Sequence, residues 1–217
     1  GDRLPAAAGR REALTRRLPP QRHPRRGECD PYPWTGEEVR LVLDQIDRQS
    51  AIGKRDYAML LLSARLGLRV GDLRRLELGW FDWRAKTLQL TQHKTGRPLT
   101  LPLPDDVGWA VIDYIRHGRP DVDCAVVFIK HRYPFTAFGS STSAGSRLRY
   151  YARRAGIVFP GGCWHGLHSL RGALAVAMLQ ADTAPLVVSA VVGPAATRPA
   201  VPPYLPLLGQ NLRRCAP

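Results

Sequence analysis

Five side chains in this sequence have the functional groups that a reaction on a phosphodiester requires: Arg69, Lys94, His168, Arg171 and Tyr204. A phosphodiester is an anion that repels nucleophiles, so an enzyme that attacks one surrounds it with fixed cations and hydrogen-bond donors. The enzyme must also supply a nucleophile, and a tyrosine hydroxyl can form a covalent intermediate. These residue types predict a cluster of cations and a nucleophile that act on one phosphate.

His168 and Arg171 stand three positions apart at the start of a predicted helix. Residues three apart share one helix face, so we expect both side chains to point the same way. The free N–H groups and the positive dipole at a helix N-terminus favour an anion there. His165 lies three positions before His168, but no carboxylate or cysteine cluster accompanies the pair, so we predict no metal site.

Arg69 and Asp72 lie in the stretch Gly-Leu-Arg-Val-Gly-Asp, and Lys94 lies between two segments of alternating hydrophobicity, 87–91 and 99–103. Such a pair of segments predicts a β-hairpin with the lysine in its turn. A lysine there can protonate a departing oxygen and offset the charge that develops on it. The simpler interpretations are a helix-end ion pair between Arg69 and Asp72 and a solvated turn lysine.

These boxes resemble those of the tyrosine recombinases of the phage-integrase type, and the resemblance covers residues 35 to 217. It implies a mainly α-helical fold with a small antiparallel β-sheet (α+β), the tyrosine-recombinase catalytic domain. The roles that it implies are binding of the scissile phosphate for Arg69, Arg171 and His168, support for Asp72, general acid for Lys94 and nucleophile for Tyr204.

The resemblance also implies an activity: site-specific breaking and rejoining of double-stranded DNA through a 3′-phosphotyrosyl intermediate. It implies no cofactor, no metal and no small-molecule substrate, and it leads us to expect tetramers on DNA and a cytoplasmic, nucleoid-associated location. Whether the role is integration, transposition or resolution stays open. Family members usually carry a separate DNA-clamping domain, for which residues 1–34 are too short, so weak and salt-dependent DNA binding is expected.

Two features near the proposed nucleophile depart from the family pattern. The family has a histidine after Leu-Gly, whereas this chain has Val-Gly followed by Pro194, and proline has no side-chain donor. Pro202 and Pro203 favour extended backbone directly before Tyr204. These departures leave open a catalytically decayed relative that only binds DNA. A type IB topoisomerase-like enzyme and a basic RNA-binding protein are further alternatives.

The composition fits a polyanionic partner, since 32 Lys and Arg against 18 Asp and Glu give the 217 residues a net charge of +14. Residues 1–34 are rich in Arg and Pro and predict a basic arm or linker, while 35–217 predict the catalytic domain. The four cysteines form no CxxC pair, and no apolar run has membrane-spanning length. The arginines expected to contact DNA are Arg97, Arg147, Arg149, Arg153 and Arg154.

The elements that must position these residues follow from periodicity and capping signals. Thr35 and Glu38 form a predicted capping box at the start of the first helix. Strands are expected at 81–83, 87–91 and 99–103. Helices are expected over 54–66, with a stop at Gly67, and from Val70 onward. A further helix is expected to begin at a cap formed by Asp105 and Asp106. After a loop at 139–146, helices are expected around Arg147 to Arg154, over 167–181 and over 185–192.

Overall fold

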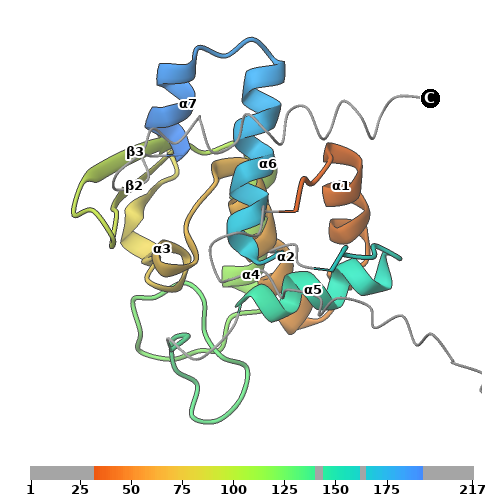
Figure 1. Ribbon diagram of the computed structural model, residues 1–217. Helices are drawn as coiled ribbons and strands as arrows, with labels where there is room; N and C mark the ends of the chain where they lie inside the picture. The colour runs from red at the N-terminus through yellow and green to blue at the C-terminus, as the bar shows by residue number, and fades with distance from the viewer. Residues whose placement is uncertain (1–31, 140–143, 162–164, 193–217) are drawn as a thin grey trace, which may run out of the picture.

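The computed structural model describes residues 32–139, 144–161 and 165–192. Within these ranges the chain forms seven α-helices and one three-stranded antiparallel sheet (Figure 1), which is the predicted fold class. The helices are α1 (Gly36–Asp44), α2 (Ala51–Leu66), α3 (Val70–Arg74), α4 (Asp105–His117), α5 (Ala144–Arg154), α6 (Leu167–Gln180) and α7 (Pro185–Val192), with a short 3-10 helix, η1 (Leu78–Trp80).

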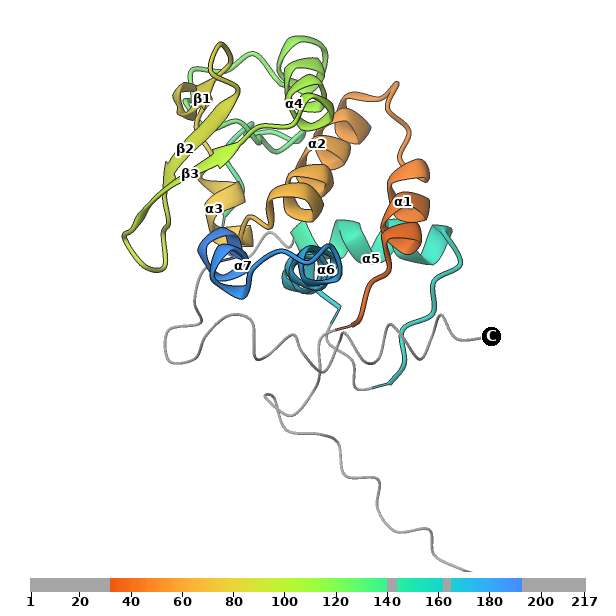
Figure 2. The same cartoon turned by 90° about the horizontal axis from the view of Figure 1, so that it is seen from above.

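The helix α2 is the centre of the core. It lies between α1 and α4 in the view of Figure 2, and α6 crosses in front of it in Figure 1. A helix that neighbours cover on several sides is apolar around most of its circumference. Accordingly, its middle turns are buried without interruption from Ala58 to Leu62. This packing places the C-terminal end of α2, at Leu66, against α6.

Several predicted helix ends are observed, and others differ for local reasons. Thr35 and Glu38 form both hydrogen bonds of the capping box. The helix α2 begins at Ala51 rather than near 54, because the Ser50 hydroxyl accepts a hydrogen bond from the Gly53 amide and caps it.

The predicted cap of α4 at Asp105 and Asp106 is wrong. Pro104 occupies the cap position with extended backbone, and the two aspartates lie inside the first turn. Carboxylates in a first turn still interact favourably with the helix dipole. The helix α5 begins at Ala144, inside the loop expected at 139–146.

The sheet has the order β1 (Phe81–Asp82), β2 (Thr87–Thr91) and β3 (Pro98–Pro102), and both pairings are antiparallel. Leu88 pairs with Leu101, and both side chains are buried, as the alternating pattern predicts. The turn between β2 and β3, which contains the exposed Lys94, closes the hairpin of these two strands, seen at the left in Figure 1.

Two residues of the predicted arm, Tyr32 and Trp34, pack into the described domain. Tyr32 and Trp34 are only 3% and 1% exposed and belong to the main core. The chain therefore packs into the domain before the first helix begins. In the described ranges no helix has both the length and the apolarity to cross a membrane.

Candidate active site

Arg171 joins the end of α2 to the start of α6. Its side chain is buried, and Nη1 donates a hydrogen bond to the backbone carbonyl of Gly67. Gly67 caps α2 in the left-handed conformation, with φ of 60°. A Cβ at this position would also lie 3.0 Å from Leu174 Cδ2. Glycine is therefore favoured twice here, by the backbone angle and by the close approach of α6.

Arg69 lies two residues beyond this junction, at the N-terminal cap of α3. The residue is half-buried, and its Nη1 atom is buried without a hydrogen-bond partner in the described part of the chain. A buried donor that lacks an acceptor is unfavourable. An oxyanion placed against this nitrogen would satisfy it, which is the role that the sequence predicts for Arg69.

The Asp72 carboxylate connects α3 to the lysine hairpin. This side chain is buried, and Oδ1 accepts a hydrogen bond of 2.8 Å from the backbone amide of His93. No ion pair between Arg69 and Asp72 occurs among the described residues. The geometry thus assigns Asp72 the positioning of the residue directly before Lys94.

The turn that carries Lys94 is closed by Gln92. The Gln92 amide donates to the Arg97 carbonyl at 2.9 Å, and the Gln92 carbonyl accepts from the Gly96 amide at 2.8 Å. Gly96 has φ of 65°, in the left-handed region that glycine adopts readily. Lys94 is exposed at this ordered turn, so its ammonium can reach a substrate.

His168 is the second residue of α6 and keeps a solvent-exposed surface. Loss of hydration lowers the pKa of its imidazole to about 4, and the positive charges of Arg171, Arg69 and Lys94 lower it in the same direction. Their influence brings four predicted site residues, from α6, α3 and the hairpin, into one electrostatic environment, here called the phosphate cluster.

The lowered pKa keeps His168 neutral at pH 7. A neutral imidazole has one donor nitrogen and one acceptor nitrogen, so it can both bond an oxyanion and receive a proton. Tyr204 and Pro194 lie outside the described residues, and their roles stay predictions. No group of three potential metal ligands occurs in the described ranges.

The predicted DNA-contacting arginines divide into two kinds. Arg97 and three arginines of α5 are exposed: Arg149, Arg153 and Arg154. Arg147 is half-buried, and its Nε lies 3.1 Å from Oδ2 of the fully buried Asp56. Contact with DNA stays a prediction for all five, but the guanidinium of Arg147 already has an internal partner.

Asp56 organises a second polar centre that the sequence reasoning missed. Its carboxylate also accepts hydrogen bonds from Arg55 at 2.7 Å and from the Tyr151 hydroxyl at 3.1 Å. Burial, together with the Asp56 charge, raises the pKa of Tyr151 to about 12. This centre, here called the Asp56 centre, ties α2 to α5. Its sequence signal is the stretch Lys54-Arg55-Asp56-Tyr57, which resembles the family's helix entry but does not reveal the contacts with α5.

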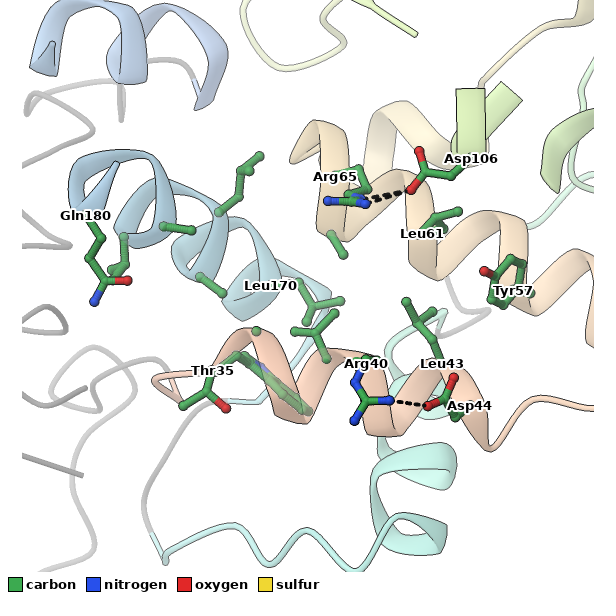
Figure 3. A pocket seen from close by; sticks show the side chains of 18 residues that line it. Thr35, Arg40, Leu43, Asp44, Tyr57, Leu61, Arg65, Asp106, Leu170 and Gln180 are labelled. Atoms are coloured by element: carbon green, nitrogen blue, oxygen red, sulfur yellow. Dashed lines mark hydrogen bonds and ion pairs between the residues drawn. The ribbon is translucent and has the colours of Figure 1, made fainter. Parts of the chain in front are cut away.

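An apolar groove of about 590 Å³ lies between α1, α2 and α6 (Figure 3). Leu43, Leu61 and Leu170 line it, and the ion pairs Arg40–Asp44 and Arg65–Asp106 lie along it. No residue of the phosphate cluster lines this groove. The groove and the phosphate cluster are therefore separate features of the described residues.

Comparison with known proteins gives matches to one family. The family model described as "Phage integrase family" matches residues 34–195. The putative integrase/recombinase y4rA of Sinorhizobium fredii is 40% identical over 144 residues, which are 66% of this chain and 34% of y4rA. The chain thus spans about a third of that relative.

Solved structures show the same fold at low sequence identity. A crystal structure of XerA recombinase aligns with a TM-score of 0.68 and 19% identity, over 92% of this chain and 67% of that one. XerH site-specific recombinase, bound to a palindromic difH substrate in a post-cleavage complex, aligns with a TM-score of 0.66 and 16% identity, over 83% and 51%. With its fold, its arginine, lysine and histidine boxes and the match over residues 34–195, the chain belongs to the phage integrase family.

Proposed function

We propose that this chain is the catalytic part of a site-specific DNA recombinase that breaks and rejoins duplex DNA through a covalent phosphotyrosine. The observation that carries the proposal is the phosphate cluster, in which the buried Arg171, a buried Arg69 nitrogen without a hydrogen-bond partner among the described residues and the exposed Lys94 all act on His168. Such an arrangement suits a phosphodiester, because fixed donors stabilise the negative charge that develops during attack.

In the proposed reaction Arg69 and Arg171 bind the non-bridging oxygens of the scissile phosphate. Tyr204 attacks phosphorus as its hydroxyl proton moves to His168, and the bond from phosphorus to the 5′ oxygen breaks. Lys94 gives a proton to that oxygen, which leaves as a 5′-hydroxyl. The tyrosine ester retains the phosphodiester energy, so a 5′-hydroxyl from another duplex can reverse the step and exchange strands.

Duplex DNA is the proposed partner, and the net charge of +14 supports it. The XerH relative was solved with its DNA substrate, which supports the same partner by analogy. We propose a tetramer on DNA as the working assembly. Because phosphate contacts release counterions, binding should weaken steeply as salt rises. Affinity that is independent of salt would contradict this partner.

Covalent trapping tests the proposed function. The protein is mixed with nicked duplexes made from its native flanking DNA, in which cleavage releases a short fragment and prevents religation. We expect a denaturation-resistant adduct that maps to Tyr204 and disappears in Tyr204→Phe. Tyr150→Phe, which alters an exposed tyrosine of α5, is the matched control and should keep the adduct.

Pro194 allows a further test of the same reaction. A histidine there would restore a hydrogen-bond donor, and one such donor is commonly worth about 100- to 1,000-fold in rate. We expect Pro194→His to accelerate adduct formation. If neither the native chain nor Pro194→His forms an adduct on native flanking DNA, the chain is a DNA-binding relative without cleavage activity.

A further inference from the structure

The buried Trp34 side chain reaches the first turn of α6. Its indole Nε1 donates a hydrogen bond of 2.7 Å to Oγ of Ser169, which lies 135 positions later in the sequence. The Ser169 hydroxyl in turn donates to the Gly166 carbonyl at 2.7 Å. Trp34 is 1% exposed and Ser169 is fully buried, so water does not compete for either bond.

These two hydrogen bonds hold the backbone that presents His168. Gly166 is the N-terminal cap of α6 and has no side chain with which to close the helix. Ser169 closes it instead, because both its amide and its hydroxyl bond to the Gly166 carbonyl. Ser169 lies between the two functional residues of this helix, next to His168 and two positions before Arg171.

Aromatic packing prevents the Trp34 ring from turning away. The ring packs edge-on against Tyr32, with centroids 5.0 Å apart, and against Phe159 at 5.6 Å. Phe159 also stacks on His165 at 4.3 Å, directly before the cap of α6. The indole is therefore held between Tyr32, which precedes it in the chain, and Phe159, in the segment that leads into α6.

We propose that Trp34 is a positioning residue, which acts through Ser169 to set the first turn of α6 and so the placement of His168 and Arg171 on the substrate phosphate. The catalytic part of this inference rests on the proposed function. Nothing in the sequence pattern couples position 34 to position 169. The coupling also ties the chain that enters the domain at Tyr32 to the catalytic helix.

Removal of single hydrogen-bonding atoms tests this proposal. Trp34→Phe keeps an aromatic ring but removes the N–H donor, and Ser169→Ala removes the hydroxyl. Because a small misplacement of catalytic groups is costly, we expect each change to slow adduct formation at saturating DNA about 10-fold or more. The Kd for duplex DNA should stay within about 2-fold, since many backbone phosphate contacts supply affinity.

Two further variants separate positioning from general stability. The double variant Trp34→Phe/Ser169→Ala should be no slower than Ser169→Ala alone, because both changes break one chain of bonds. Tyr32→Phe removes the hydroxyl that donates to Glu38 at 2.6 Å, in the same aromatic cluster, and should leave the rate unchanged. A lower melting temperature with a normal rate for the folded protein would overturn the proposal, as would additive effects in the double variant.

A readout without DNA distinguishes this inference from the proposed function. The titration of the His168 imidazole, followed by NMR in the free protein, should move from a midpoint of about 4 toward 6.5 in Trp34→Phe, as the ring becomes more hydrated and leaves its cationic neighbours. If the native protein forms no adduct but this shift occurs, the proposed function fails and the positioning role stands. If the midpoint does not move, the positioning role fails even where the native protein is active.

Discussion

The Asp56 centre and the phosphate cluster differ in the groups that accept hydrogen bonds from their arginines. In the Asp56 centre one buried carboxylate lies 2.7 Å from an Arg55 nitrogen and 3.1 Å from Arg147 Nε. In the phosphate cluster Arg171 donates to a neutral backbone carbonyl, and a buried nitrogen of Arg69 makes no hydrogen bond within the described residues.

This difference separates arginines that pair with a buried carboxylate from arginines that the proposed function assigns to an anionic substrate. The single Asp56 carboxylate pairs with both Arg55 and Arg147, so it offsets one of the two positive charges and fixes both side chains, which joins α2 to α5. A neutral carbonyl orients a guanidinium without cancelling its charge. The lowered pKa of His168 reports the positive field that remains in the phosphate cluster.

The largest expected effect on stability comes from Asp56→Asn. This change leaves two guanidinium groups around a neutral amide, and breaking a buried ion pair from one side costs about 3–5 kcal/mol. Urea unfolding should show that loss. Asp106→Asn is the control, because its exposed pair with Arg65 should contribute at most about 1 kcal/mol. Equal losses in the two variants would mean that the Asp56 centre is not a structural junction.

The largest expected effect on chemistry comes from Arg171→Lys. Lysine keeps the charge but lacks the planar fork that can bond both the Gly67 carbonyl and a phosphate. Loss of one oxyanion donor predicts adduct formation slower by about 100- to 1,000-fold. Rapid-quench assays of adduct formation measure this rate. Arg65→Lys, at an exposed ion pair on α2, should retain the native rate, and a native rate in Arg171→Lys would rule out the assigned role.

A smaller loss is expected from Asp72→Ala, which releases the His93 amide and so the turn that carries Lys94. A displacement of about 1 Å can cost on the order of 100-fold, so we predict a rate loss of about 10- to 100-fold. Asp72→Asn keeps an acceptor oxygen at the same place and should retain most of the activity. If Asn and Ala are equally impaired, the charge of Asp72 matters rather than its hydrogen bond.

The smallest predicted change is a shift in the titration of His168. In the free protein we expect a midpoint of about 4 by NMR, and Lys94→Met should raise it toward 6.5 by removing one positive charge. Lys86→Met alters a lysine that is paired with Asp105 and should leave the midpoint unchanged. A midpoint near 6.5 in the native protein would mean that His168 does not experience the positive field inferred for the phosphate cluster.

The sign of the linked stability follows from that lowered pKa. The unfolded chain binds a proton on His168 near pH 6.5, whereas the folded protein does so only near pH 4. The contribution of neutral His168 to stability is therefore present above pH 6.5 and is lost as pH falls from 6.5 toward 4. The free energies of unfolding of the native protein and of His168→Gln, measured between pH 6.5 and pH 4, should therefore approach each other as the pH falls.

Sequence reasoning succeeded where neighbours along the chain decide the structure. The capping box of Thr35 and Glu38, the stop at Gly67 and the strands around the lysine turn all depend on residues a few positions apart. It failed at the cap of α4, because Pro104 takes the extended conformation that a capping aspartate would otherwise adopt.

The sequence by itself identified the candidate phosphate-binding side chains, the three-residue spacing of His168 and Arg171 and the glycine stop at Gly67. Only the tertiary structure decided the partners of the buried carboxylates: Asp56 pairs with Arg147 as well as Arg55, whereas Asp72 accepts from the His93 amide of the lysine hairpin. It alone brought Trp34 to Ser169. The physical reason is that periodicity and capping act over a few residues, while these contacts depend on how α2, α5 and α6 pack together.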